Sequence, residues 1–327
     1  MRICSSCNNS IDDDDHLTCQ SCNKQIHKEC AITKDGVFCD LCYVNKGNDE
    51  SEEKKDIEVP DVIRRSHIET YRTCPYKFYN EVILDNPMPE NMYTKLGVDL
   101  HELFEKACLD NEYKKDEMTN DFMKMFQDYE EDLFDNEEKK AEMYVRGVDS
   151  IETFYHVIKD MPPAYDVEVK TQFSIGENLP EISATFDRVN LVDGELEVVD
   201  WKTGNVLVGK NLSSDFQAPI YIYGIKQYYD MPVRKFTFYY LKDNKVREFN
   251  RIDDSNVYVC MVGKRKYVID INKMLREVQH LFSQIMKGNF NIPIDTSKMY
   301  FPCKMCHIRE QGKCEGADIQ VWRQFNK

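Results

Sequence analysis

Residues 182–204 read ISATFDRVNLVDGELEVVDWKTG, and this stretch decides the fold that we expect. Its two halves, 182–191 and 195–201, read as strands, and the turn pair Asp193-Gly194 between them predicts a β-hairpin. Strand patterns continue at 166–175, 235–241 and 246–250. Helical patterns lie on both sides, at 66–81, 97–109, 118–160, 213–229 and 271–287. The chain is therefore predicted to be an α/β protein.

The hairpin brings three charged residues together. Asp187 is expected at the end of the first strand. Asp200 and Lys202 lie two residues apart, so their side chains point to the same side of the second strand. Two carboxylates would hold a hard divalent cation such as Mg²⁺, and the lysine would orient water or offset the charge of a phosphate. From these three residues alone, an ordinary charged surface hairpin is the commoner explanation.

The surrounding motifs resemble those of a known family. The run 198–204, VVDWKTG, which follows a strand with Asp187-Arg188-Val189, resembles the RecB-like nuclease motif of the PD-(D/E)XK superfamily. Residues 99–104, DLHELF, resemble its histidine-bearing helix, and residues 216–221, FQAPIY, resemble its Q-x3-Y helix. The resemblance implies a restriction-endonuclease-like core with a mixed sheet flanked by helices. Ala184 departs from the glycine that is frequent in the family.

The resemblance also implies a catalytic set. Its members are Asp187, Asp200, Lys202, Gln217 and Tyr221, with His101 as a further metal ligand. The histidine and the two aspartates would bind Mg²⁺ or Mn²⁺, and the lysine would position the attacking water. The glutamine and the tyrosine, four residues apart on one helix face, would support the lysine or hold DNA. Glu168, on the preceding strand, is either an outer ligand or an ordinary surface residue.

A second set of cysteines flanks this core. Residues 66–78, SHIETYRTCPYKF, resemble the first cysteine segment of iron–sulfur RecB-like nucleases, which include CRISPR-associated and AddB-type exonucleases. Those proteins pair one cysteine before the core with three after it. The resemblance implies a [4Fe–4S] cluster on Cys74, Cys303, Cys306 and Cys314. Four thiolates match such a cluster in type and number, and Zn²⁺ is the alternative. His307 is a possible substitute ligand.

Residues 1–44 read as a separate metal-binding module. The spacing C-x2-C, x11, C-x2-C, x4, H-x2-C, x8, C-x2-C gives eight ligands in four pairs, which suits two tetrahedral Zn²⁺ ions. The ligand order resembles a PHD finger, whose pairs interleave. This resemblance implies one zinc on Cys4, Cys7, His27 and Cys30, and the other on Cys19, Cys22, Cys39 and Cys42. Val37 stands where the family usually has tryptophan, so general protein or DNA binding fits better than histone-tail reading.

The finger is followed by residues 45–59, which are almost without apolar side chains and are expected to form a flexible acidic linker. Residues 60–327 are expected to form the nuclease domain. The 327 residues include 43 Lys and Arg against 58 Asp and Glu, a formal net charge of −15. This balance argues against coating of nucleic acid by bulk charge.

The sequence contains no run that approaches the about 18 apolar residues of a membrane span. Its first residues have no apolar signal-peptide core, so we expect an intracellular protein, in the cytoplasm or in a host cytoplasm if a phage encodes it.

These patterns predict a metal-dependent DNA nuclease, specifically an exonuclease that acts on DNA ends or single strands in recombination, repair or phage DNA processing. The finger would engage a protein partner. The alternative is a DNA-binding or recruitment protein that does not cleave. The rings of Tyr71, Phe78 and Tyr221 either stack on single-stranded bases or lie in the core.

Overall fold

The computed structural model describes residues 2–3, 10–11, 16–20, 23–28, 31, 33, 36–38, 57–110, 112–292, 303 and 306–314. The chain divides into two compact units. The larger unit comprises residues 61–65 and 89–282, and the smaller unit comprises residues 1–60, 66–88 and 283–327. Across the described ranges, no helix is long and apolar enough to cross a lipid bilayer.

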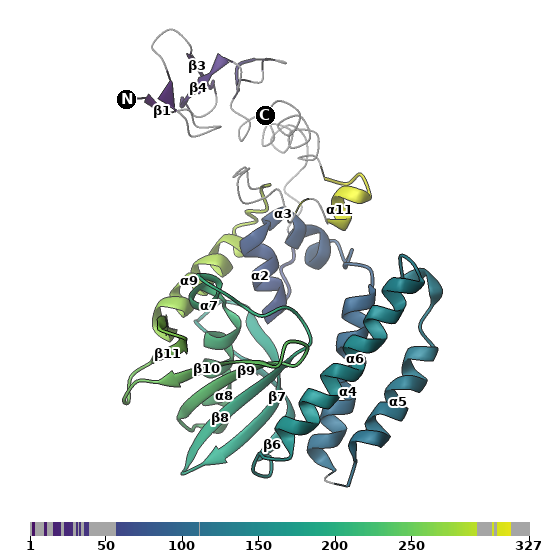
Figure 1. The fold of residues 1–327 in the computed structure, drawn as a ribbon. Coiled ribbons are helices and arrows are strands. Elements are labelled where there is room, and N and C mark those ends of the chain that lie inside the picture. The colour runs from purple at the N-terminus through teal and green to yellow at the C-terminus, as the bar shows by residue number, and fades with distance from the viewer. Residues whose placement is uncertain are drawn as a thin grey trace. The chain divides into compact units, whose positions relative to one another are not determined.

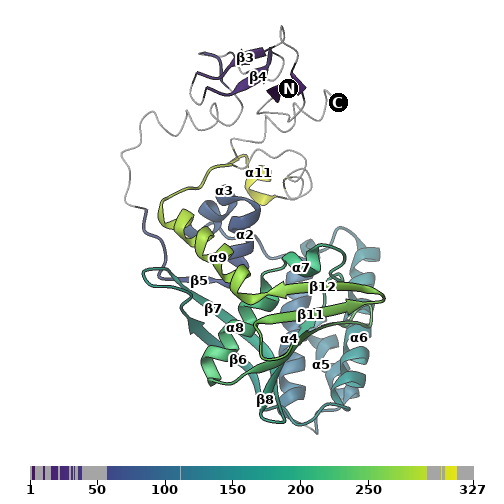
Figure 2. The same ribbon diagram turned by 90° about the vertical axis from the view of Figure 1, so that its left-hand side faces the viewer.

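The larger unit is built on an eight-stranded mixed sheet (Figures 1 and 2). Its strands are β5 (Val62–Arg64), β6 (Asp166–Phe173), β7 (Glu181–Val192), β8 (Glu195–Lys202), β9 (Val233–Tyr240), β10 (Lys245–Arg251), β11 (Val257–Val262) and β12 (Arg265–Asp270). The order is β12-β11-β10-β9-β8-β7-β5, and β6 also pairs with β7. The β5–β7 and β8–β9 contacts are parallel, and the other contacts are antiparallel.

The predicted hairpin is confirmed as β7 and β8. Its turn residues, Asp193 and Gly194, have φ values of 52° and 80°, the left-handed conformation that a tight two-residue hairpin turn requires. The register between the strands runs up to the pair Arg188–Val199. Asp187 lies inside β7, so its expected place at the strand end was wrong. The strand continues past Asp187 because β6 pairs with it as far as Ile182.

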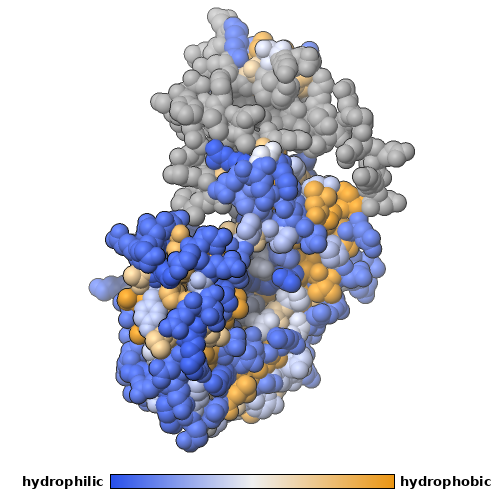
Figure 3. Space-filling model, turned by 90° about the vertical axis from the view of Figure 1, so that its right-hand side faces the viewer, coloured by the Kyte–Doolittle hydropathy of each residue, from blue (hydrophilic) through white to orange (hydrophobic). Residues whose placement is uncertain are grey.

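Three helices cover one face of the sheet: α4 (Met92–Leu109), α5 (Lys115–Gln127) and α6 (Glu137–Ile158). Their apolar side chains form one cluster with Val199 and Trp201 of β8. Phe154 of α6 stacks on Phe104 of α4 with 4.2 Å between ring centroids, and it meets Trp201 edge-on at 4.9 Å. Figure 3 shows the side of the molecule on which α5 and α6 lie, where the surface is mostly hydrophilic, as expected for helices with charged outer faces.

The other face of the sheet carries α8 (Gln217–Tyr229), which follows the short helix α7 (Asn211–Ser214). Tyr221 of α8 contacts Phe186 and Phe236, with ring centroids 4.8 and 6.1 Å apart. Gly224 permits a close approach to β6, because a Cβ atom there would lie 2.3 Å from a ring carbon of Phe173. This packing fixes the position of α8 against the strands.

The predicted helices are present, but the helical stretch expected at 118–160 is interrupted at 128–136 and forms the two helices α5 and α6. α4 begins at Met92, earlier than the expected residue 97, because Asn91 and Thr94 form a capping box at its start. The hairpin of β11 and β12, which turns at Gly263 with a φ of 59°, was not predicted. The short parallel strand β5 was not predicted either. The helix expected at 271–287 is present as α9 (Ile271–Met286), directly after β12.

The smaller unit contains α2 (Arg65–Thr73), α3 (Pro75–Phe78), the π-helical turn η2 (Tyr79–Ile83) and α11 (His307–Glu310). The predicted break at Cys74-Pro75 is confirmed, with Cys74 as the N-cap of α3. Phe290 stacks on Phe78 and Tyr79, with ring centroids 6.0 and 5.1 Å apart. Segments far apart in the sequence therefore share one core.

The described part of the finger contains four very short strands: β1 (Arg2–Ile3), β2 (Ser10–Ile11), β3 (His16–Thr18) and β4 (Gln25–His27). β3 pairs with β4 in antiparallel register. Cys19, Ile26 and Phe38 form a small buried cluster.

Of the two roles considered for Tyr71, Phe78 and Tyr221, burial in the core, the commoner one, is confirmed, and stacking on bases is not. Their exposed fractions are 3%, 0% and 7%, so their rings are buried in protein. The hydroxyl of Tyr71 donates a hydrogen bond to the carbonyl oxygen of Asn289 at 2.6 Å. These aromatic side chains therefore support the fold.

Candidate active site

Four elements of the larger unit carry the residues that the sequence singled out. These residues are His101 on α4, Asp187 on β7, Asp200 and Lys202 on β8, and Gln217 and Tyr221 on α8. They come from segments that span more than a hundred residues of sequence, and the sheet and its two helical layers bring them together. Hydrogen bonds and ion pairs connect most of them.

Asp200, Lys202 and Gln217 form a closed triangle. The Nζ atom of Lys202 lies 2.6 Å from Oδ2 of Asp200 and donates to Oε1 of Gln217 at 2.9 Å. The Nε2 atom of Gln217 donates to Oδ1 of Asp200 at 2.7 Å. Gln217 thus fixes the carboxylate of Asp200 and the ammonium of Lys202 relative to each other. The sequence pointed to Gln217 only through the family resemblance.

Asp200 is 3% exposed, and burial raises its pKa to about 6, although the charge of Lys202 opposes this shift. Its buried Oδ2 atom lies 2.6 Å from the Lys202 ammonium, and the positive charge of His101 also favours the ionised carboxyl.

Asp187 joins the two strands where their regular pairing ends. Its Oδ2 atom accepts a hydrogen bond of 2.6 Å from the backbone N–H of Trp201, and Oδ1 lies 3.3 Å from Nδ1 of His101. The imidazole of His101 is 32% exposed. Burial lowers the pKa of His101, but the charge of Asp187 and its hydrogen bond outweigh burial, so the pKa is raised.

Glu168, expected to be either an outer ligand or, more commonly, a surface residue of the strand, lies beside Asp187. It lies opposite Asp187 in the β6–β7 register, between the pairs Val167–Arg188 and Val169–Phe186, with a φ of 51°. Its side chain is half-buried, and burial, followed by the charge of Asp187, raises its pKa to about 6. Glu105, one turn beyond His101 on α4, also acts on Glu168 electrostatically.

Sequence reasoning missed Glu105, although its position four residues after the histidine places both on one helix face.

Tyr221 is a buried residue beneath the site. The guanidinium carbon of Arg65 lies 5.9 Å from the centroid of its ring, and burial raises the pKa of its hydroxyl. Tyr221 is 7% exposed, and its side chain hydrogen-bonds to Gln217. It therefore supports Gln217 and does not present its ring to DNA.

A ready-made cluster of three or more His, Cys, Asp or Glu ligands is not found among the residues that the structure describes. In the catalytic set, the ammonium of Lys202 and the amide of Gln217 occupy both oxygens of Asp200. The donors nevertheless suit a hard cation, because carboxylate oxygens and an imidazole are ligands that Mg²⁺ and Mn²⁺ accept. The fit to a cation therefore rests on the chemistry of these donors, since Oδ2 of Asp200 lies 2.6 Å from the Lys202 ammonium.

The four cysteines of the second set gather in the smaller unit. Burial raises the pKa of Cys74 to about 12, and the charges of Cys314, Cys303 and Cys306 raise it further, so the four thiols lie within electrostatic reach of one another. Cys303 and Cys314 pack with Ile292. They do not form the compact group that would hold a single ion.

His307, next to Cys306, faces Glu81, with 3.7 Å between its Nδ1 atom and Oε1. Of the eight zinc ligands expected in the finger, Cys19 and His27 lie in the described part of the chain. Cys4, Cys7, Cys22, Cys30, Cys39 and Cys42 lie outside the described residues.

Comparison with known proteins gives one informative match. The family model of the PD-(D/E)XK nuclease superfamily matches residues 65–311. No curated protein matches the chain. The crystal structure of SSO0001 is 11% identical, and the alignment covers 84% of this chain and 93% of that one with a TM-score of 0.35. The crystal structure of VC1899 from Vibrio cholerae is 14% identical, with 68% and 56% covered and a TM-score of 0.21. Both TM-scores are too low to support a conclusion.

Proposed function

Since the chain belongs to the PD-(D/E)XK nuclease superfamily, whose members are phosphodiester hydrolases, we propose that it is a RecB-like DNA exonuclease that depends on a divalent metal ion. Its substrates would be DNA ends or single strands, in recombination, repair or phage DNA processing. The observation that carries this proposal is the triangle of Asp200, Lys202 and Gln217 beside the Asp187–His101 pair.

The metal site of this proposal consists of His101, Asp187 and Asp200, which would hold Mg²⁺ or Mn²⁺. When bound, the cation would polarise the scissile phosphate and neutralise part of its charge. The three side chains come from α4, β7 and β8, and the hydrogen bond from the Trp201 N–H fixes Asp187 against β8. This contact supports a role of Asp187 in the proposed metal site.

Lys202 would do the work that the protein itself contributes to the reaction. Its side chain is 26% exposed, and its Nζ atom carries three N–H donors, of which one is held by Gln217 and one by Asp200. The third would orient the attacking water or donate to a phosphate oxygen as negative charge develops there. Gln217 keeps Nζ in place, and Tyr221 supports Gln217 one helical turn further on.

We also propose that Cys74, Cys303, Cys306 and Cys314 hold a [4Fe–4S] cluster. The mutual influence of the four thiols in the smaller unit supports this proposal. A four-iron cluster holds its thiolates farther apart than one ion does, which agrees with the lack of a compact single-ion group among the described residues. Metal analysis of anaerobically purified protein distinguishes iron with sulfide from Zn²⁺. The finger of residues 1–44 would bind two Zn²⁺ and a protein partner.

The decisive experiment is cleavage of end-labelled linear DNA and closed circular DNA by anaerobically purified protein with Mn²⁺ or Mg²⁺. Linear DNA is expected to be degraded while circles survive, and a chelator is expected to stop the reaction. A parallel preparation of Lys202→Ala controls for contaminating nucleases and is expected to be inactive. Cleavage of circles would replace the exonuclease by an endonuclease. DNA binding without cleavage would favour a recruitment protein.

A further inference from the structure

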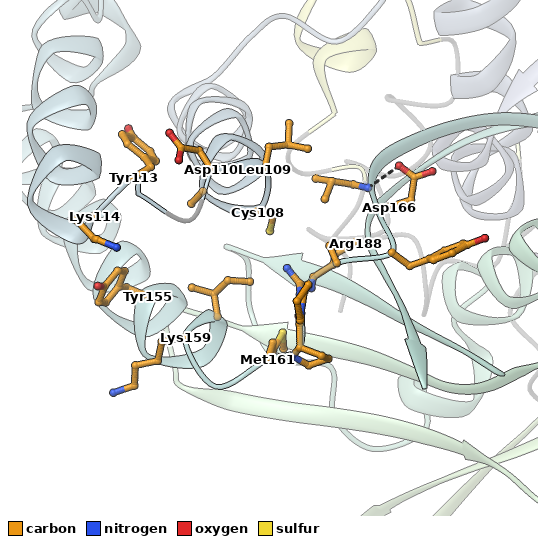
Figure 4. Close-up of a pocket in the computed structure, with 17 residues that line it drawn as sticks. Cys108, Leu109, Asp110, Tyr113, Lys114, Tyr155, Lys159, Met161, Asp166 and Arg188 are labelled. Carbon is orange, nitrogen blue, oxygen red and sulfur yellow. Dashed lines mark hydrogen bonds between the residues drawn. The ribbon is translucent and has the colours of Figure 1, made fainter. Parts of the chain in front are cut away.

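A cavity of about 550 Å³ opens in the larger unit at the C-terminal end of α4 (Figure 4). Its wall consists of the ends of α4 and α6, the segment that joins α6 to β6, and Arg188 of β7. Cys108 in this wall lies seven residues, or about two helical turns, beyond His101 on α4. None of the proposed catalytic residues lines the cavity. Its volume is in the range of about 300–1,000 Å³ that is usual for small-molecule sites.

Arg188 is the unusual feature of this cavity. The residue is 2% exposed, and its Nε atom donates to Oδ1 of Asn190 at 2.8 Å. One Nη atom donates to the carbonyl oxygen of Pro162. The guanidinium also forms a hydrogen bond with the thiol of Cys108. Within the described part of the chain, no ion pair joins Arg188 to a carboxylate. A buried guanidinium without a counter-charge is costly, so the cavity favours an anion.

The other charged groups of the wall agree with this expectation. Lys114 and Lys159 are exposed at its margin, on the side of the cavity seen at the left of Figure 4. The two carboxylates of the wall already have partners. Asp166 accepts hydrogen bonds from the Tyr229 hydroxyl and the Val167 N–H, at 2.6 and 2.9 Å, and Asp110 accepts one from the Glu112 N–H at 2.9 Å. These donors are neutral and leave both carboxylates charged, so the wall carries three cationic groups against two carboxylates, a net charge of +1.

Flat apolar surfaces lie next to these cations. The half-buried ring of Tyr155 and the exposed prolines Pro162 and Pro163 line the same cavity. A planar ring packs well against aromatic and proline faces, and a guanidinium binds the oxygens of a phosphate in a bidentate manner. The lining thus combines a phosphate-binding group with a surface for a base.

We propose that this cavity binds a nucleotide, with its phosphate at Arg188, Lys114 and Lys159 and its base against Tyr155 and Pro162. The same chemistry is presented by a free mononucleotide and by the phosphorylated end of a DNA strand. Binding at this site does not require cleavage, so it stands apart from the proposed nuclease activity.

The test measures binding to the full-length protein by calorimetry in the presence of a chelator, so that the candidate active site holds no cation. The probes are deoxythymidine 5′-monophosphate, thymidine, inorganic phosphate and a 5′-phosphorylated oligothymidylate. The variants are Arg188→Met, Lys159→Ala and Lys202→Ala, and Lys245→Ala is an exposed-lysine control outside the cavity. We expect Arg188→Met to raise the Kd of the monophosphate at least about tenfold, because it removes charge-assisted hydrogen bonds. Lys159→Ala is expected to raise it a few-fold.

Lys202→Ala and Lys245→Ala are expected to bind the monophosphate as the wild type does, and thymidine is expected to bind far more weakly. Tighter binding of the free monophosphate than of the oligothymidylate identifies a released nucleotide as the ligand, and the reverse identifies a strand end. If Arg188→Met does not fold, the Kd values of the monophosphate for Lys159→Ala and Lys114→Ala test the proposal instead. The proposal is overturned if thymidine binds as well as its monophosphate, if no probe binds, or if the cavity variants bind like the wild type.

Discussion

The candidate active site and the four-cysteine region are held together in different ways. In the active site, Asp187, Asp200, Lys202 and Gln217 take part in hydrogen bonds and ion pairs of 2.6 to 2.9 Å. In the cysteine region, the thiols share burial and electrostatic influence, and Ile292 is the buried residue of the apolar cluster that contacts them. The first site is organised by protein contacts, whereas the second would be organised by the proposed cluster.

This difference predicts opposite responses to mutation. A substitution in a hydrogen-bonded site changes chemistry and leaves the fold intact, because the sheet and helices keep their own cores. A substitution in a site organised by a bound cofactor removes folding free energy, because binding and folding are coupled there. The following experiments test whether the two regions differ in this way, from the largest expected effect to the smallest.

Asp200→Asn should separate chemistry from stability most clearly. Loss of one metal-binding carboxylate should lower kcat/KM by about 10²–10³-fold, because several kcal/mol of transition-state stabilisation are lost. The Tm should change little, because the fold already disfavours the ionised form of this buried carboxyl. Asp193→Asn, in the exposed hairpin turn, is the matched control and should keep full activity. A large drop in the Tm of Asp200→Asn would contradict a preorganised site.

Cys74→Ser should show the opposite pattern. Loss of one cluster ligand should remove most of the bound iron and lower the Tm by at least about 10 °C, because the segments before and after the larger unit lose their link. Iron content, the visible absorbance of the cluster and a thermal melt measure these effects. Cys108→Ser, outside the cysteine set, should retain the iron. If Cys74→Ser keeps the iron content and the Tm of the wild type, the cysteine region does not depend on a cluster, and the proposed difference between the two regions is wrong.

Gln217→Leu tests the bridge between Asp200 and Lys202. Residues that orient a metal ligand typically contribute about 10–100-fold to activity, and we expect a loss of kcat in this range. Gln227→Leu, an exposed position on the same helix, is the control. Unchanged kcat in Gln217→Leu would mean that Lys202 is positioned without the bridge.

The pH dependence gives the smallest effect. Burial raises the pKa of Asp200 to about 6, and the charge of Asp187 raises the pKa of His101 above its ordinary value, so His101 takes up a proton first and Asp200 follows as the pH falls toward 6. A protonated carboxyl or imidazole does not bind a cation, so kcat/KM at limiting Mn²⁺ should fall by up to about tenfold between pH 7 and 6, where one group titrates, and more steeply below 6, where both are protonated. Higher Mn²⁺ should shift this loss to lower pH. A profile that is flat from pH 7 to 5 would rule out these two groups as ligands.

Local patterns in the sequence predicted the parts of the fold that local geometry determines. The turn pair Asp193-Gly194 and the alternation on both sides were sufficient for the β7–β8 hairpin, and the spacing of Asp200 and Lys202 was sufficient for their contact. The position of Asp187 was misjudged because the extent of β7 depends on its pairing with β6, a separate segment.

Contacts between distant segments were beyond such reasoning. β5 has only three residues and is a strand because it pairs with β7 more than a hundred residues away. The half-buried position of Glu168 depends on a left-handed backbone conformation. Glutamate rarely adopts this conformation, and no sequence pattern predicts it. Gln217 was found through the family resemblance, and its two hydrogen bonds became visible only in the structure.

The smaller unit is assembled from segments that precede and follow the larger one, since residues 66–88 and 283–327 belong to it. During synthesis, residues 89–282 leave the ribosome before the last cysteines exist. The larger unit can therefore fold early, whereas the smaller unit can close only after residues 283–327 have been synthesised. Maturation of this protein thus has a built-in order, in which the proposed iron insertion comes after the catalytic residues have met.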